Sequence, residues 1–238
     1  MIKPQDSLAM IMNPKQPEQR LLAVALALVA VIGLGYASVS RRWMYNPATM
    51  FGEYGFGPTG MFVCGDDYKD KACERMSNSA LIDRWHEEDL QEDERVASLV
   101  ARGADASTIS RAEAIAKRLH EDHHTSGAFP LVGWLAFAGC LLAALSLAAA
   151  LALVALKKRP ALPIMPTTTA ILGIMLAIVT GCLFVATKPG GSGFIGVSFG
   201  FWGYGVGCVV GIAATLMLNR SLRPVDDELA EPMNADQF

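Results

Sequence analysis

Four long stretches of this 238-residue sequence contain no Asp, Glu, Lys, Arg or His. They cover residues 21–40, 130–156, 167–187 and 194–219, and their apolar residues fill every helical face rather than one stripe. A helix needs roughly 20 apolar residues to cross about 30 Å of hydrocarbon, and each stretch reaches that length. The missing charge therefore argues against a soluble fold and predicts an all-α membrane protein, a bundle of four transmembrane helices.

The absence of ionisable residues at membrane depth also narrows the function. Coupled transporters, proton relays and voltage sensors keep such residues inside the membrane, so we do not expect an ion-coupled transporter. The sequence also lacks a GxxxxGK phosphate loop, an HExxH motif and a recognisable Ser-His-Asp spacing. We therefore expect neither an enzyme nor a bound cofactor. No segment has the dense basic stripe of a nucleic-acid-binding surface.

Basic residues are few in the short connections, and their placement predicts the orientation. Three follow the second stretch, at positions 157–159, whereas only Lys188 follows the third. Positive residues in short loops mark the cytoplasmic side, which favours a plasma membrane or bacterial inner membrane protein with both termini cytoplasmic. The cytoplasmic segments would be 1–20, 157–166 and 220–238, and the extracytoplasmic ones 41–129 and 188–193.

The first apolar stretch has two possible roles, a retained span or a cleaved signal peptide. Small residues at its end suit a signal peptidase. Its apolar run is, however, longer than the roughly 7–15 residues usual for a signal peptide, and 20 residues precede it. We therefore expect a retained span.

Cysteine is scarce, with five in the chain, and three of these lie within the spans. Cys64 and Cys73 both lie in the long segment 41–129. In an oxidising compartment such a pair predicts a disulfide; two free thiols or half of a metal site are the alternatives. The CxxC spacing that would favour metal is missing.

The long segment 41–129 predicts a small β unit followed by two helices. Its first part is rich in glycine, and residues 61–64 are typical of a short strand. From Ser79 apolar residues recur at helical spacing until Gly103 ends the helix. Ser110 and Glu113 have the spacing of a capping box, which predicts the start of the second helix there.

All four histidines lie in this segment, and His120, His123 and His124 form a cluster. His120 and His124 are one helical turn apart, a spacing that can place two imidazoles on one metal ion. The alternative is a solvated helix end, where histidine is favoured by the helix dipole. Because no distant fourth ligand is evident, the second interpretation is the stronger one.

Glycines mark the fourth apolar stretch. Gly203, Gly207 and Gly211 recur at every fourth position and so line one helix face, with Gly196 and Gly200 as a second pair. Small residues at this spacing allow close helix packing. We expect them to pack within the bundle, with an oligomer or partner interface as the alternative. The nearby aromatic residues, including Trp202, suit a partner groove or a membrane-interface belt.

One motif adds a resemblance. Trp43, then Gly60-Met61-Phe62-Val63-Cys64, then Cys73, placed between the first two of four spans, resembles the claudin and peripheral-myelin-protein superfamily. Phe62 stands near where that motif has its last Trp, one residue closer to the cysteine. The resemblance implies a left-handed four-helix bundle capped by a small outer β-sheet. It also implies lateral and cell-to-cell contacts, as junction strands, pores or auxiliary subunits.

These observations favour a non-enzymatic membrane scaffold or accessory subunit, whose outer loop contacts other subunits or further copies within the lipid bilayer. The alternative is a claudin-like channel or pore-forming oligomer. Segment 41–129 holds 11 basic and 16 acidic residues, a net charge of −5, which would attract cations. The second alternative is a metal-handling membrane protein that uses the histidine cluster.

Overall fold

The computed structural model describes residues 17–49, 52–64, 73–156, 165–190 and 195–222. Within these residues four helices are long and apolar enough to cross a membrane, which indicates a multi-pass membrane protein and confirms the four predicted spans. They are α2 (Pro17–Val39), α5 (Phe129–Ala155), α6 (Met165–Ala186) and α7 (Phe199–Leu222). The basic cluster at 157–159 and the acidic tail beyond 222 lie outside the described residues, so the orientation stays a prediction.

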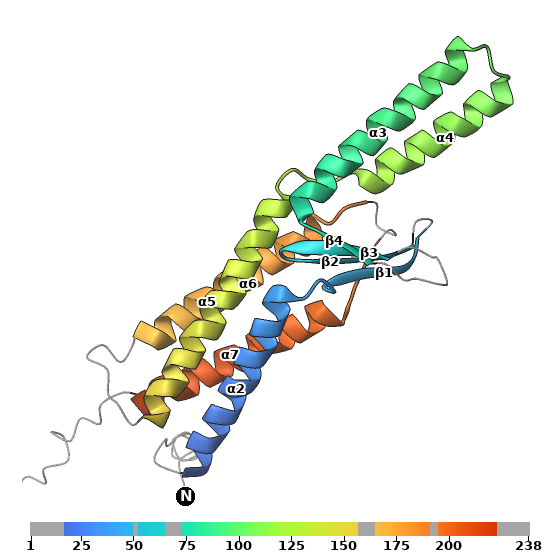
Figure 1. Cartoon of the computed structure of the whole chain (residues 1–238). Helices are drawn as coiled ribbons and strands as arrows, with labels where there is room; N and C mark the ends of the chain where they lie inside the picture. Colours follow the sequence, from blue (N-terminus) through green and yellow to red (C-terminus); the bar gives the residue numbers. More distant parts are fainter. Residues whose placement is uncertain (1–16, 50–51, 65–72, 157–164, 191–194, 223–238) are drawn as a thin grey trace, which may run out of the picture.

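The four helices form a bundle in which α2 and α6 each contact both α5 and α7 (Figure 1). The most extensive contact, α5 with α6, has small residues at its closest points. A Cβ atom added at Gly139 would lie 2.6 Å from the backbone nitrogen of Ala177, and one added at Gly173 would lie 2.6 Å from that of Ala143. These reciprocal pairs bring the two backbones together and gain van der Waals contact that lipid does not supply.

The glycines of α7 contact two other helices less closely. An added Cβ at Gly207 would lie 3.3 Å from the Leu34 side chain of α2, and one at Gly211 would lie 3.0 Å from Ile174 of α6. At Gly203 no atom lies within 4 Å of the added Cβ. Gly207 and Gly211 thus pack inside the bundle, whereas Gly203 has open space beside it.

The expected helical pair of Gly196 and Gly200 is wrong, because α7 begins only at Phe199. Gly196 lies in strand β5 (Gly196–Val197) instead. Gly200 lies in the first turn of α7, where its N–H donates to the Arg42 carbonyl at 3.0 Å. An added Cβ there would lie 2.4 Å from the same oxygen, so glycine permits this contact.

A five-stranded antiparallel sheet lies at one end of the bundle (Figure 1). The strands are β1 (Met44–Thr49), β2 (Gly52–Gly57), β3 (Gly60–Cys64), β4 (Cys73–Met76) and β5, in the order β4-β3-β2-β1-β5. The predicted strand at 61–64 is confirmed as β3. Strand β1 follows α2, and strand β5 precedes α7. Because β1 and β5 pair, the α2–α5 connection and the α6–α7 connection meet at the same end of the bundle.

The predicted disulfide between Cys64 and Cys73 is confirmed. It joins the last residue of β3 to the first of β4, which face each other in the sheet. Closing this short loop restricts the unfolded chain and stabilises the fold by about 2–3 kcal/mol. The thiols of Cys140 and Cys208 are buried in the bundle, whereas Cys182 is exposed.

Helices α3 (Asn78–Ala101) and α4 (Ala106–His123) form a hairpin that projects away from the sheet and the bundle (Figure 1). Gly103 lies in the turn between them with φ 67°, as its predicted role of ending α3 requires. The predicted capping box at Ser110 is wrong. Asp105 caps α4 by accepting the Thr108 N–H at 2.9 Å, so Ser110 already lies inside the helix.

Hydroxyl groups also stabilise this cap. Ser107 and Thr108 both donate side-chain hydrogen bonds to the Asp105 carboxylate, and the Thr108 N–H adds a third. These donors favour the charged form and lower the pKa of Asp105 to about 2. The hairpin turn is therefore held by an ionised cap at neutral pH.

Trp43 joins the sheet to three of the membrane helices. Its indole N–H donates to the Ala37 carbonyl at the end of α2, at 2.8 Å. The fully buried ring lies 4.5 Å from the ring of Tyr204 and 5.9 Å from those of Phe184 and Phe201. One side chain thus contacts α2, α6 and α7 at the end of the bundle that carries the sheet.

The turn between β2 and β3 also rests directly on the helices. Asn78, buried at the start of α3, donates its side-chain N–H groups to the carbonyls of Gly57 and Pro58, both at 3.1 Å. A Cβ added at Gly133 of α5 would lie 2.2 Å from the Pro58 carbonyl oxygen. The backbone of the β2–β3 turn therefore packs directly on the backbone of α5, which fixes the distance between the sheet and the bundle.

We predict that Trp43→Ala lowers the free energy of unfolding in detergent by about 3–5 kcal/mol, because it removes a buried ring and a hydrogen bond. Trp202→Ala is the matched control, since Trp202 is 67% exposed, and should cost less than about 1 kcal/mol. Thermal unfolding of the two purified variants measures the difference. Equal losses would contradict the anchoring role of Trp43.

We also predict that Gly173→Ala destabilises the bundle by about 1–3 kcal/mol, because the new methyl group collides with the α5 backbone. Gly203→Ala, also in a membrane helix, has open space and should change stability by less than about 0.5 kcal/mol. The same unfolding measurement applies. If Gly203→Ala were the more damaging change, α7 rather than the α5–α6 pair would make the critical contact.

Candidate functional site

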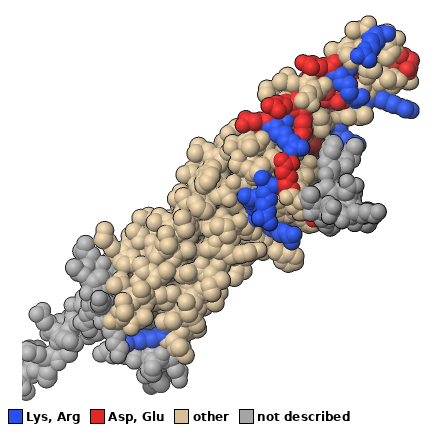
Figure 2. Space-filling model, in the orientation of Figure 1, with Lys and Arg blue, Asp and Glu red and all other residues tan. Residues whose placement is uncertain are grey.

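The α3–α4 hairpin, residues 78–123, is called the arm below. Its 24-residue helix α3 is about 36 Å long, yet only Asn78, Leu81 and Trp85, all near its start, are buried. In α4 the buried residues are Ala112 and Ala116. Figure 2 shows charged side chains gathered over the arm, whereas the bundle face in the same view is almost free of them. The arm thus offers most of its surface to its surroundings.

An aromatic cluster holds the base of the arm. Trp85 of α3 lies with its ring 6.3 Å from that of Phe56 in β2, and Phe56 lies 6.3 Å from Phe129 of α5. On its other side Trp85 stacks on the His123 imidazole, with centroids 4.7 Å apart and planes 10° from parallel. Both ends of the arm therefore meet over the sheet.

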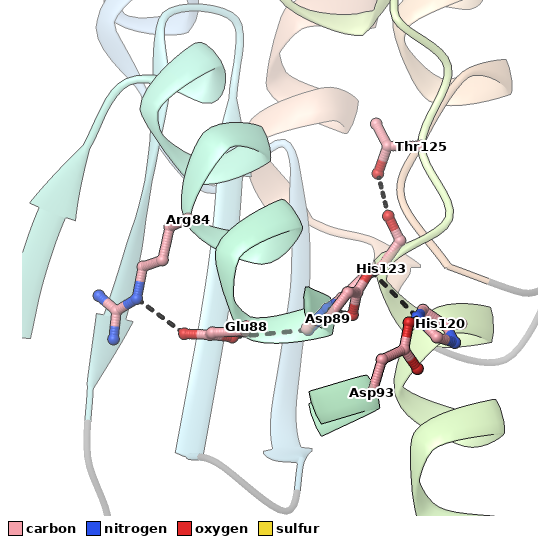
Figure 3. A network of polar contacts seen from close by, with 7 residues as sticks. All are labelled: Arg84, Glu88, Asp89, Asp93, His120, His123 and Thr125. Atoms are coloured by element: carbon pink, nitrogen blue, oxygen red, sulfur yellow. Dashed lines mark hydrogen bonds and ion pairs between the residues drawn. The ribbon is translucent and has the colours of Figure 1, made fainter. Parts of the chain in front are cut away.

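Polar contacts reinforce this base (Figure 3). His123, whose side chain is 7% exposed, places Nδ1 2.7 Å from Asp89 Oδ1 and Nε2 3.8 Å from Glu88 Oε2. Arg84 donates to Glu88 at 2.9 Å and to Glu74 of β4 at 2.8 Å. The network ties the end of α4 to α3, and α3 to the sheet. Hydrogen bonds to Glu74 and Glu88 also raise the pKa of Arg84.

Two of the three clustered histidines share a carboxylate of α3. His120 lies 3.7 Å from Asp93 and 4.0 Å from Asp89, whereas His123 contacts Asp89 at 2.7 Å. His124 lies just beyond α4, and its carbonyl accepts the N–H of Gly190 from the α6–α7 connection at 3.0 Å. Among the described residues no group of three His, Cys, Asp or Glu side chains is arranged to hold a metal ion. Sequence reasoning missed the α3 carboxylates as partners because they are about 30 residues away.

The outward face of α3 carries acidic residues around one apolar side chain. Asp83, Glu87, Leu90 and Glu94 are all exposed, and their spacing places them on one side of the helix, away from α4. We call this set the outer stripe. Its three carboxylates form no ion pair with any residue in the described ranges, unlike Glu88, which pairs with Arg84. The sequence predicted amphipathicity for α3 but not which acids would be left unpaired.

Burial in the sheet also changes the pKa of a tyrosine below the arm. Tyr54 of β2 is 8% exposed and lies on the same side of the sheet as Phe56. Burial, with a smaller contribution from Glu88, raises the pKa of Tyr54. The Tyr54 hydroxyl is therefore neutral at physiological pH and belongs to the packed base rather than to a reactive site.

The remaining residues of the predicted motif, Gly60 and Phe62, take part in the packing of the sheet. Gly60 starts β3 where an added Cβ would lie 2.4 Å from the Met76 carbonyl oxygen. The Phe62 ring is nearly buried and covers Gly55, whose added Cβ would lie 2.0 Å from it. Both glycines give the space that close strand packing needs.

Exposed aromatic residues mark the edge of the apolar band. Tyr36, Trp134, Phe199 and Trp202 are exposed and lie close to the sheet-side ends of α2, α5 and α7. Aromatic side chains in such positions are typical of a membrane–water interface. An interface belt and a partner groove both stay predictions for Trp202.

Together these features define a class of protein: a four-span membrane protein with a disulfide-linked sheet and a projecting helical arm at one end. No protein-family model matches the chain, and no match was found among curated proteins. The likeness to the claudin and peripheral-myelin-protein superfamily therefore stays a prediction.

We predict that Asp89→Ala loosens the end of α4, because it removes the short contact to the nearly buried His123. Hydrogen exchange of the amides in α4 should become about tenfold faster, which corresponds to about 1.4 kcal/mol. Asp93→Ala is the control, since Asp93 is more exposed and lies 3.7 Å from His120. Equal exchange in both variants would show that the Asp89 contact does not hold the arm.

Proposed function

We propose that the protein is a non-enzymatic membrane scaffold or accessory subunit that binds another protein through its arm. The observation that carries this proposal is the projecting arm itself, ordered at its base and almost unburied along the rest of its length. Among the membrane helices, α3 contacts α5, and the end of α4 is held by α3 through His123.

The energetics of the arm support a partner. Most helical stability in proteins comes from packing an apolar face, and ordering a residue costs about 1–2 kcal/mol of backbone entropy. Beyond its base the only fully buried residues of the arm are Ala112 and Ala116, and Val96, Leu99 and Leu119 are half-buried. An exposed hairpin of this length gains further stabilisation when a second protein covers it.

The charge of the arm indicates the kind of partner. Helix α3 contains seven acidic and two basic residues, and both basic residues pair with acids of the arm or the sheet. The outer stripe stays negative, with Leu90 at its centre. A basic surface with an apolar contact point would complement it, because opposite charges at a rim speed association and exclude wrong partners.

A second candidate is a claudin-like channel-forming oligomer. It is favoured by one combination: four membrane helices, a small sheet at one end, and a disulfide between neighbouring strands of that sheet, as the resemblance to this superfamily implies. The exposed face of α7, with Trp202, Val206 and Val209, would then contact a further copy rather than lipid.

The first experiment is purification in a gentle detergent, with the mass and protein content of the particle determined. A particle that holds a different protein supports the accessory-subunit proposal, and conductance in planar bilayers then tests the channel candidate separately. A particle built from several copies of this chain favours the second candidate. A bare monomer contradicts both.

We predict that reversing two charges of the outer stripe, Glu87→Lys with Glu94→Lys, releases the partner from this particle. Two exposed acids of α4, changed as Glu113→Lys with Glu121→Lys, provide a control with the same change in net charge. A photoreactive residue in place of Leu90 should crosslink to protein, and one in place of the lipid-facing Leu145 should not. Retention of the partner by both double variants would contradict binding through the outer stripe.

A further inference from the structure

A pocket of about 460 Å³ lies where α2 ends beside the sheet. Three arginines line it, Arg41, Arg42 and Arg75, together with the disulfide, Tyr36 and Val39. Figure 2 shows a basic patch at the level of the sheet, between the bundle and the arm. The pocket differs from the outer stripe in both charge and position. The pocket is basic and lies beside the end of α2, whereas the outer stripe is acidic and lies on the arm.

Phe62 organises two of these arginines. The Arg42 guanidinium carbon lies 5.4 Å above the Phe62 ring, and Arg75 is the residue opposite Phe62 on the neighbouring strand β4. Arg41 is oriented separately, because its Nη1 donates to the Met61 carbonyl at 3.3 Å. Three segments of the chain, the end of α2, β3 and β4, therefore hold three cationic groups around one pocket.

The arginines of this pocket have no acidic partner among the described residues. None of the three guanidinium groups forms an ion pair within the described ranges of the chain, whereas Arg84 and Arg95 each pair with glutamates. Gathering like charges is unfavourable unless an anion joins them. Arginine presents a planar fork of donors that matches phosphate oxygens, so a phosphate group is the anion that this set suits best.

The apolar side of the pocket indicates where the phosphate comes from. Tyr36 and Val39 are exposed on the last turns of α2, and Ile32 continues the same helix face toward the membrane interior. We propose that the pocket binds the phosphate of an anionic membrane phospholipid, whose acyl chain lies along Ile32, Tyr36 and Val39. A free phosphate ion would use the arginines but not this apolar track.

The test is native mass spectrometry of the full-length protein in detergent, titrated with phosphatidylglycerol, with phosphatidylcholine or with inorganic phosphate. The wild-type protein should bind phosphatidylglycerol more tightly than phosphatidylcholine. Arg42→Gln with Arg75→Gln should weaken phosphatidylglycerol binding at least about tenfold, because each arginine supplies charge-assisted hydrogen bonds. Arg111→Gln with Arg118→Gln, two exposed arginines of α4, removes the same charge outside the pocket and should change binding by less than about twofold.

Three results would overturn the proposal: no preference for phosphatidylglycerol in the wild type, equal loss in both double variants, or displacement of the lipid by inorganic phosphate at equal concentration. Arg75→Gln alone provides a second test if the double variant unfolds, because Arg75 is exposed at the sheet edge. It should weaken lipid binding while leaving thermal unfolding unchanged. The outcome does not depend on whether the arm binds a partner.

Discussion

The hydrogen bond from the Trp43 indole to the Ala37 carbonyl fixes the relation between the membrane bundle and everything outside it. A helix that ends at the membrane edge leaves carbonyl groups without helical partners, and an unsatisfied carbonyl in an apolar setting is costly. Trp43 satisfies one of them and packs its ring against α6 and α7. Its own backbone then pairs with Phe56 of β2 and with Ser198, and β1 begins at the next residue.

The sheet in turn fixes the position of the arm. Asn78 holds the start of α3 to the β2–β3 turn, and Trp85 packs on Phe56. At the other end of the arm, His123 returns to Asp89, and His124 accepts a hydrogen bond from the α6–α7 connection. These contacts hold the base of the arm in place, although the rest of the arm is little buried. Because the arm is already ordered, a partner could bind it without a large loss of conformational entropy.

Two sets of charged side chains without ion pairs in the described chain lie on different parts of the molecule. Three arginines lie together beside the end of α2, and the carboxylates of the outer stripe face outward on the arm. Arg84 and Arg95 of α3, by contrast, each pair with glutamates. This arrangement follows from topology, because the disulfide brings β4, with Arg75, back beside the end of α2.

The sequence alone determined the four spans, the strand at 61–64, the Cys64–Cys73 pair and the two helices of the arm, because length, hydropathy and local spacing act within a single segment. It placed the start of α4 too late and took Gly196 into a helix, since a short side-chain cap at Asp105 and a strand pairing to β1 decide those points. Only the tertiary structure decided that Gly139 and Gly173 make the closest helix contact, that His123 pairs with Asp89, and that three arginines share a pocket. Those facts depend on residues far apart in the chain, whose approach no local pattern records.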